Sequence, residues 1–159
     1  IYGPRDREML DLFRAARWGV VPTPREGRAS LIHVEDLARL LVALVSGGEE
    51  VSTRVFEPDD GRYRGWSHDE MARAIGAAVG RRPIVVGLSR KAMERAARAD
   101  RFLRGEKAKL PLDRAAYFSH PDWVVSEGAR VPAAIWQPRI ETRAGLKGTA
   151  RWYREHKWL

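Results

Sequence analysis

Cysteine is absent from the 159-residue sequence, which excludes disulfide bonds, thiol nucleophiles and cysteine-based metal sites. Long apolar runs are also missing: the longest extends only from Leu40 to Val45, whereas a membrane-spanning helix needs about 20 such residues. The first residues show no basic segment followed by an apolar one, so no secretion signal is predicted. Together these absences predict a cytoplasmic protein with no membrane partner.

Glycine patterns for nucleotide binding are missing as well. A G-x-G-x-x-G string or a P-loop lets backbone N–H groups approach phosphates closely, and neither occurs here. The pairs Gly61/Gly65 and Gly76/Gly80 have the wrong spacing. The sequence therefore contains no dinucleotide-binding fingerprint of its own.

The histidines, at positions 33, 68, 120 and 156, form no i,i+4 pair and have no carboxylate cluster nearby, so no metal site is predicted. His33 falls within an expected strand, and we interpret it as a half-buried, hydrogen-bonded histidine rather than a catalytic one. His68 falls in the first turn of an expected helix and is predicted to be solvated.

Acidic residues are fewer than basic ones, 21 against 29, which gives a net charge of +8. Most of the excess lies between Arg81 and Lys109, where ten basic residues accompany only three acidic ones. This segment has two interpretations: a face that binds nucleic acid or another polyanion, or a solvated amphipathic helix. We favour the helix, since the segment offers almost no aromatic residue for base stacking. Its expected inward residues are Ala92, Ala96, Ala99 and Leu103.

Hydrophobic residues make up 44% of the chain, enough for a globular domain, and strand-like and helix-like segments alternate along it. The predicted fold class is therefore α/β. Ser67 and Glu70 have the spacing of a helix capping box, and Gly80 is the expected end of that helix. Helices are expected at 7–18, 37–45, 68–79, 90–104, 112–118 and 143–156, and strands after Gly19 and at 30–34, 53–57 and 83–88.

Near the end of the chain, Tyr153 and Lys157 have the Tyr-x-x-x-Lys spacing of short-chain dehydrogenases, in which the lysine lowers the pKa of a catalytic tyrosine. Tyr153 also falls on the apolar stripe of the last predicted helix, with Leu146 and Ala150. We therefore reject the pair as catalytic. Trp123 and Trp136, in a proline-rich loop, are interpreted as packing residues.

Four strings in the sequence, taken in order, resemble the C-terminal half of extended short-chain dehydrogenases/reductases, the NAD-dependent epimerase/dehydratase family. They are YGPRD (2–6), SLIHVEDLARLLVAL (30–44), GWSHDEMARAIGAAVGRRP (65–83) and GLKGTARWYREHKWL (145–159). The resemblance implies the edge of a Rossmann-type sheet plus the smaller mixed α/β substrate-binding domain, with the N-terminal nucleotide-binding half absent. Residues 1–6 and 35–57 would pack on the missing Rossmann body, and residues 7–34 and 58–159 would form mainly the substrate-binding region.

The resemblance also implies a site. Tyr2, Gly3 and Pro4 would line the nicotinamide end of a bound NAD or NADP. Many family members that use nucleotide sugars place an arginine just before the strand of the I-H-V string, where this chain has alanine, so Arg28, one residue earlier, is the expected anion ligand. Arg5 and His33 are the other expected substrate contacts.

By the same resemblance, the catalytic Tyr-x-x-x-Lys pair and the cofactor loop would precede Ile1, so this chain contributes no catalytic residue and is expected to be inactive alone. The complete protein would transfer hydride to or from a sugar or another hydroxyl or carbonyl substrate, with a homodimer as one option. Two alternatives stay open: a stand-alone basic module for nucleic acid or another polyanion, and a non-catalytic relative of the same fold. We also expect marginal folding of the isolated chain, because strand 53–57 would expose unpaired edges.

Overall fold

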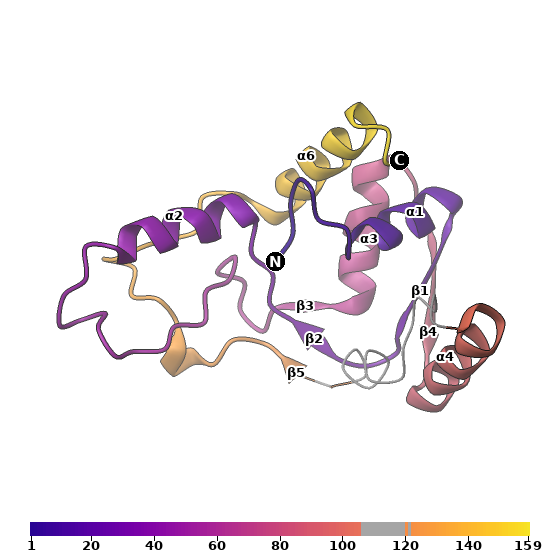
Figure 1. Ribbon diagram of the computed structural model, residues 1–159, viewed down its shortest axis with the longest axis horizontal. Helices are drawn as coiled ribbons and strands as arrows, with labels where there is room; N and C mark the ends of the chain where they lie inside the picture. Colours follow the sequence, from indigo (N-terminus) through magenta and orange to yellow (C-terminus); the bar gives the residue numbers. More distant parts are fainter. Residues whose placement is uncertain (106–119, 121) are drawn as a thin grey trace.

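The structure is a computed structural model that describes residues 1–105, 120 and 122–159. Its main body combines three helices with a two-stranded parallel sheet (Figure 1). Helices α1 (Leu10–Trp18) and α3 (His68–Val79) pack against strands β1 (Val20–Pro24) and β4 (Ile84–Leu88), and α6 (Thr142–Glu155) packs on α3. The predicted α/β class is confirmed.

The hydrophobic core lies where these helices meet one face of the β1–β4 sheet. In β1 the side chains alternate between buried and exposed, as expected for a strand covered on one face only. The apolar stripe predicted for the last helix is confirmed, since its three members are fully buried. The largest fully buried apolar side chains of the core are Tyr2, Phe13, Val21, Ile75, Leu146 and Tyr153.

A second, three-stranded sheet has the order β3-β2-β5 and consists of short strands: β2 (Arg28–Ala29), β3 (Trp66–Ser67) and β5 (Asp122–Trp123). Helix α2 (Val34–Leu44) extends away from this sheet, and the short helix η2 (Glu127–Ala129) lies in the segment that follows β5 (Figure 1).

Helix α3 has the ends that the sequence predicts. The Ser67 hydroxyl accepts a hydrogen bond from the Glu70 N–H at 3.1 Å, and the Glu70 carboxylate accepts one from the Ser67 N–H at 2.9 Å. Gly80 ends the helix in the left-handed conformation, with φ of 77°. A capping box and a glycine terminator therefore fix both ends.

The strand predicted at 30–34 is wrong. This segment forms only the isolated bridge between Tyr2 and His33, and helix α2 already begins at Val34. Its backbone groups pair with three separate segments: the Ser30 N–H with Trp123, the Leu31 carbonyl with residue 60, and the Ile32 carbonyl with residue 2. A strand requires successive pairs along one neighbour, so the local β-propensity is overridden here.

The strand predicted at 53–57 is also wrong. These residues adopt turns and irregular backbone, with Val55 82% exposed. The Glu57 N–H donates to the Ala129 carbonyl at 2.8 Å, but no strand runs alongside this segment in the described part of the chain. Because no strand forms here, there is no unpaired strand edge at 53–57, and the reason given for marginal folding of the isolated chain no longer applies.

Helix α4 (Arg90–Arg104) forms as predicted, but its inward face is different. Met93 and Ala97 are buried, whereas Ala96 and Ala99 are exposed. The two buried side chains lie four positions apart and therefore on one face of the helix, whereas Phe102 is 90% exposed. The side chain of Leu103 and the helix predicted at 112–118 lie outside the described residues.

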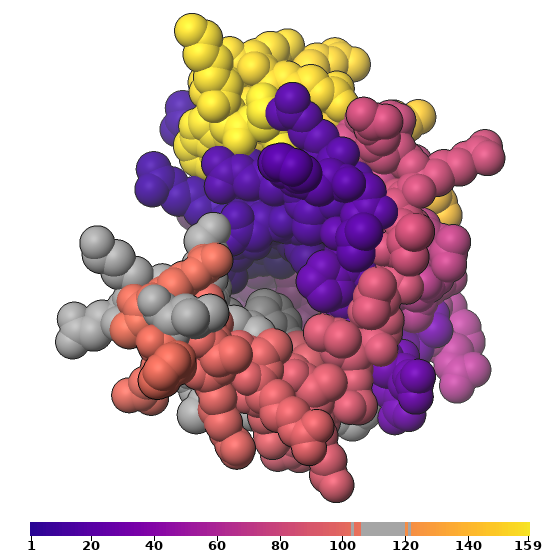
Figure 2. All heavy atoms as spheres, turned by 90° about the vertical axis from the view of Figure 1, so that its right-hand side faces the viewer, coloured from indigo at the N-terminus to yellow at the C-terminus, as the bar shows by residue number. Residues whose placement is uncertain are grey.

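Figure 2 views the face of the molecule beside α4. The surface is hollowed between the indigo N-terminal residues and the pink-to-orange residues of β4 and α4. The outward side chains of the β1–β4 sheet include the apolar residues Val20, Ile84 and Val86, which are 48%, 69% and 40% exposed.

Candidate functional site

The first expected site residue, Tyr2, lies directly against His33. The Tyr2 N–H donates to the Ile32 carbonyl at 3.0 Å, and the Val34 N–H donates to the Tyr2 carbonyl at 2.8 Å. The Tyr2 and His33 rings meet edge to face, with centroids 5.2 Å apart. The structure therefore brings together two residues that lie 31 positions apart in the sequence.

The phenol of Tyr2 is a buried hydrogen-bond donor. Its hydroxyl donates to the Thr142 carbonyl at 3.3 Å, and the side chain is 1% exposed. Burial, reinforced by the nearby carboxylate of Asp60, raises the pKa of Tyr2 to about 12. The phenol is consequently neutral at physiological pH and cannot serve as a general base there.

Gly3 continues this close packing. A Cβ at Gly3 would lie 2.5 Å from Cγ1 of Val34, and the backbone φ is +152°, so only glycine fits. The Gly3 carbonyl accepts a hydrogen bond from the Asp6 N–H at 3.3 Å. Pro4 is half-buried and Arg5 is exposed. Of the expected site residues at 2–5, only the last two present side chains to solvent.

His33 caps helix α2. Its Nδ1 accepts a hydrogen bond from the Glu35 N–H at 3.2 Å, which satisfies one of the free N–H groups at the helix start. Burial lowers the pKa of His33, so the imidazole is neutral near pH 7. The interpretation of His33 as a hydrogen-bonded histidine agrees with this geometry, although the residue is more buried than expected, at 6% exposure.

Arg28 lies elsewhere, on β2, and its guanidinium is already engaged. Nε donates to the Arg64 carbonyl at 2.6 Å, and Nη2 donates to the Gly65 carbonyl at 3.0 Å and to the Glu70 carboxylate at 3.3 Å. These contacts tie β2 to the beginning of α3, and none of them involves Tyr2 or His33. An anion binding to Arg28 would have to compete with Glu70.

Asp59 and Asp60 both accept hydrogen bonds through their carboxylates, the first from a buried position and the second from a half-buried one. Asp59 is 5% exposed, and its carboxylate accepts hydrogen bonds from the Ser30 hydroxyl at 2.9 Å and from the Arg130 guanidinium at 2.7 Å. Asp60 accepts from the Trp66 indole N–H at 2.7 Å and from the Thr142 hydroxyl at 2.5 Å. Asp59 thus joins the residue after β2 to the residue after η2, and Asp60 joins β3 to the start of α6.

Asp36 is a second buried carboxylate, 1% exposed, at the start of α2. It accepts hydrogen bonds from the backbone N–H groups of Arg139 and Ile140, and it pairs with the Arg39 guanidinium. Acidic residues are common in the first turn of a helix, so the sequence could have indicated that Asp36 lies at a helix start. The sequence did not reveal that the carboxylate points toward the segment preceding α6.

His68 is not solvated, contrary to the prediction. It is 8% exposed, and its Nε2 has no hydrogen-bond partner among the described residues. The ring packs beside Gly27: a Cβ there would lie 3.0 Å from Nε2. Burial lowers the pKa of His68, so the ring is neutral near pH 7.

The Tyr153 phenol donates to the Asp6 carbonyl, and the side chain is fully buried. Burial raises the pKa of Tyr153. Lys157 lies beyond the last residue of α6 and has a φ of +59°, so the two side chains do not share a helical face. This geometry supports rejecting them as a catalytic pair.

No group of three or more histidine or acidic side chains in the described part of the chain could hold a metal ion. Among residues 1–105, 120 and 122–159, no helix is long and apolar enough to cross a membrane.

Solved structures with a similar fold include two epimerases. Over 98% of this chain, a UDP-glucose 4-epimerase from Thermotoga maritima, determined with UDP-glucose, superposes with a TM-score of 0.61 at 16% identity. An epimerase from Methanothermobacter thermautotrophicus superposes over 98% of the chain with a TM-score of 0.58 at 21% identity. The protein gox2253 superposes over 99% of this chain with a TM-score of 0.61 at 17% identity. The fold of this chain is therefore the fold of part of these proteins.

The chain spans less than half the length of each of these proteins: 44% of the Thermotoga enzyme, 41% of the Methanothermobacter epimerase and 47% of gox2253. No protein-family model and no curated protein matches the sequence.

Proposed function

We propose that this chain is the substrate-binding portion of an NAD(P)-dependent epimerase, dehydratase or reductase that acts on a sugar or another hydroxyl or carbonyl substrate. The observation that carries the proposal is the structural similarity to a UDP-glucose 4-epimerase along 98% of this chain but only 44% of the enzyme. The ordered motifs from YGPRD to the final helix point the same way. Hydride transfer and proton transfer would be the task of residues outside this chain.

Within the proposal, the nicotinamide cofactor contacts this chain at Pro4 and Arg5 rather than at the two residues before them. The backbone N–H and carbonyl of Tyr2 are both hydrogen-bonded, and Gly3 is packed against Val34. Tyr2 and Gly3 would instead hold the exposed residues in place. Arg5 is exposed, has a left-handed backbone and has no acidic partner among the described residues, so within the proposal its guanidinium would meet a negatively charged substrate or cofactor group.

The direct test uses the native protein isolated from its source. Intact mass and N-terminal sequencing establish the length of the mature chain, and nucleotide released by denaturation is identified as NAD or NADP. We expect a mass well above that of 159 residues, a Gly-rich loop and a Tyr-x-x-x-Lys pair upstream of Ile1, and a bound or titratable nicotinamide nucleotide. A mature chain that starts at Ile1 and binds neither nucleotide would contradict the proposal.

A second candidate function is polyanion binding by α4. Its exposed face carries Lys91, Arg95, Arg98 and Arg101, whereas Arg90 and Arg104 pair with acidic residues of the same helix. Neutralising phosphates with such residues gives an affinity that falls steeply with salt. Binding of single- or double-stranded DNA or RNA that weakens with added salt would favour this candidate, and no binding at low ionic strength would exclude it.

A further inference from the structure

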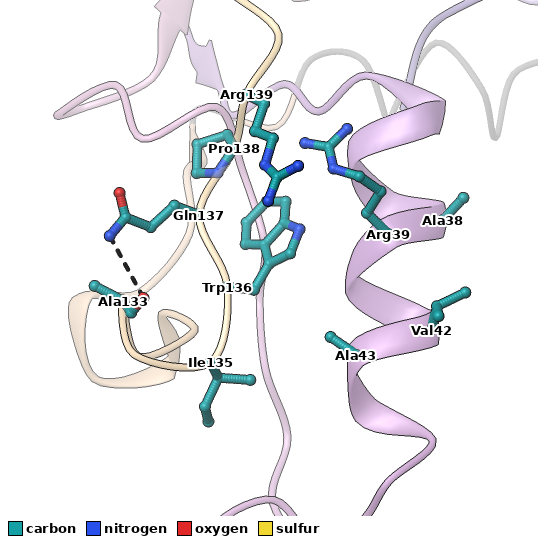
Figure 3. A pocket seen from close by; sticks show the side chains of 10 residues that line it. All are labelled: Ala38, Arg39, Val42, Ala43, Ala133, Ile135, Trp136, Gln137, Pro138 and Arg139. Carbon is teal, nitrogen blue, oxygen red and sulfur yellow. Dashed lines mark hydrogen bonds between the residues drawn. The ribbon is translucent and has the colours of Figure 1, made fainter.

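Two apolar areas of the surface contain none of the residues expected at the substrate or cofactor site. The first is a groove of about 760 Å³ between helix α2 and residues 133–139, with Ala43 and Trp136 on opposite walls (Figure 3). By the family resemblance, residues 35–57 would pack against a Rossmann body outside this chain, so the groove gives no evidence of a ligand. The second area is the outward side of the β1–β4 sheet, whose strands belong to the expected substrate-binding region instead.

The register of this sheet decides which backbone groups of β4 are paired. The strands are parallel, and the Ile84 N–H donates to the Gly19 carbonyl at 2.8 Å. Successive residues of a strand direct their backbone N–H and carbonyl groups to opposite sides, so Ile84 and Val86 face β1. The backbone groups of Val85 and Gly87 therefore face away from β1, along the outer edge of the sheet.

The outer edge of β1 is blocked, whereas that of β4 is open. The residues of β1 whose backbone faces away from β4 include Pro22 and Pro24, and proline has no N–H to donate. Proline on an edge strand prevents further strands from pairing with it. On β4, Val85 and Gly87 keep their N–H groups, and no strand of the described chain pairs with them. Gly87 is exposed, so its backbone is accessible.

The sequence of β4 is typical of a strand with neighbours on both sides. It is a continuous apolar run, Ile-Val-Val-Gly-Leu, as found in the interior of parallel sheets. In the structure, however, Ile84 and Val86 are 69% and 40% exposed, and Val20, opposite Ile84 on β1, is 48% exposed. A third strand beside β4 would place side chains about 5 Å from these residues and would cover part of their surface.

Positive charges flank β4 at both ends. Arg81 and Arg82 precede the strand, are exposed and have no acidic partner among the described residues. Arg25 is exposed beside the other end, where its N–H donates to the Leu88 carbonyl at 2.9 Å, and Lys91 is exposed in the first turn of α4. A second copy of the chain is a poor partner for this edge, because antiparallel or parallel pairing would bring cationic ends together.

We propose that the free edge of β4 binds an extended, acidic segment of another protein as a third strand. The segment would exchange backbone hydrogen bonds with Val85 and Gly87, its apolar side chains would lie beside Ile84 and Val86, and acidic residues at its ends would meet the flanking cations. In this mode of recognition the main-chain bonds give affinity and the side chains give specificity. The inference does not rest on the proposed function, because no residue expected at the substrate or cofactor site lies on β1 or β4.

Fluorescence anisotropy of labelled peptides mixed with the full-length protein tests the proposal. The probe is a capped peptide in which Val-Thr-Val-Thr-Val is flanked by two glutamates at each end. One control has lysine in place of every glutamate. The other has proline in place of both threonines, which keeps the charge and removes backbone donors. We expect the probe to bind at least about tenfold more tightly than either control. Equal affinity for the proline peptide, or no binding of the probe at millimolar concentration, would overturn the proposal.

Amide hydrogen exchange locates the bound peptide. The N–H groups of Val85 and Gly87 should exchange at least about tenfold more slowly when the probe is bound, because they gain acceptors. The Val86 N–H, which faces β1, should change little. Slower exchange confined to α2 or α4, with Val85 and Gly87 unaffected, would place the peptide elsewhere and contradict the proposal.

Variants separate backbone pairing from charge. Gly87→Pro gives β4 the proline edge that β1 already has, and should abolish binding. Arg81→Glu combined with Arg82→Glu should weaken binding of the probe about tenfold and strengthen binding of the lysine peptide. The matched control is Lys147→Glu combined with Arg151→Glu, an equal charge change on exposed residues of α6, which should leave both affinities nearly unchanged. Equal losses in the two double variants would indicate general electrostatic attraction and would count against the edge.

Circular dichroism checks the fold of each variant, and sedimentation equilibrium checks the assembly. If Gly87→Pro does not fold, the charge variants and the hydrogen exchange of the unmodified protein still test the proposal. A dimer that Gly87→Pro dissociates would show that the edge pairs with a second copy, and the proposal of an acidic partner would then be wrong.

Discussion

The carboxylate of Asp36 accepts a hydrogen bond from the Ile140 N–H at 3.0 Å, across 104 positions of the sequence. It also accepts from the Arg139 N–H at 3.1 Å and pairs with the Arg39 side chain. One buried charge thus fixes the start of α2 to the segment that leads into α6. Its negative charge is offset by the adjacent guanidinium, the N–H groups and the N-terminus of the helix.

Replacing Asp36 by asparagine should lower the free energy of unfolding by about 2–4 kcal/mol, because the substitution leaves Arg39 without its partner and turns an amide N–H₂ toward backbone donors. Urea denaturation followed by circular dichroism measures the change. Glu35→Gln is the matched control: Glu35 is adjacent and exposed, and its substitution should cost no more than about 0.5 kcal/mol. Similar losses in both variants would mean that the buried hydrogen bonds are not what stabilises this junction.

The sequence was a good guide where structure depends on neighbouring residues. The capping box of Ser67 and Glu70 and the stop at Gly80 are properties of a few adjacent positions, and the structure confirms them. The apolar stripe of α6 follows from helical periodicity, which is also local.

The sequence predictions were wrong where contacts with distant segments determine the local structure or the burial of a residue. Residues 30–34 and 53–57 have β-branched and aromatic side chains, yet no strand runs along either of them in the described chain, so propensity alone misassigned them. His68 was expected to be solvated because its helix position is often exposed, but it is buried in the fold beside Gly27. The Asp36 junction joins residues a hundred positions apart, and no local pattern predicts such a contact.

Glu70 should make the free energy of unfolding depend on pH in the acidic range. Its pKa lies below the ordinary value of 4.5, chiefly because the carboxylate accepts the Ser67 N–H, with Arg62 adding to the effect. A depressed pKa stabilises the folded protein above pH 4.5, and the contribution is lost as the pH falls through the folded-state pKa. Since the side chain is 38% exposed, Glu70→Gln should cost only about 0.5–1 kcal/mol at pH 7.

Denaturation of Glu70→Gln at several pH values tests this. The difference from the unmodified protein should be largest at neutral pH and should shrink below pH 4.5. Glu155→Gln, an exposed glutamate of α6, should show no such pH-dependent difference. A difference for Glu70→Gln that stays constant down to acidic pH would mean that the charge is not responsible.

His68 should destabilise the protein at mildly acidic pH. Burial lowers its pKa from 6.5, so the unfolded chain binds a proton more readily than the folded one, and stability falls as the pH drops below 6.5. His68→Leu removes the titrating ring, whose Nε2 has no partner among the described residues, and should flatten the pH dependence between about pH 7 and pH 5. His33, whose pKa is also lowered, should supply a remaining slope of the same sign.

Thermal melts across this pH range provide the measurement. His156→Gln is the control, because His156 is exposed at the end of α6. If His156→Gln flattens the profile and His68→Leu leaves it unchanged, the acid sensitivity does not come from the buried ring.

Two glycines of α6 should respond oppositely to the same substitution. A Cβ at Gly145 would lie 2.5 Å from the Tyr2 hydroxyl and 3.0 Å from Cγ2 of Ile140, whereas a Cβ at Gly148 meets nothing within 4 Å. Alanine has a higher helix propensity than glycine, so Gly148→Ala should stabilise the protein by about 0.5–1 kcal/mol. At Gly145 the same gain is outweighed by overpacking, and Gly145→Ala should destabilise by about 1–3 kcal/mol.

The helix and the chemical change are the same in both variants, so their difference in the free energy of unfolding isolates the contact with Tyr2 and Ile140. Tyr2→Phe removes the hydroxyl, the nearest atom to a new Cβ, and should recover part of the loss when combined with Gly145→Ala, a coupling that a double-mutant cycle measures. Equal stabilisation by both alanines would show that α6 does not pack closely on Tyr2. The buried position of Tyr2, on which the assignment of Pro4 and Arg5 to the cofactor rests, would then be wrong as well.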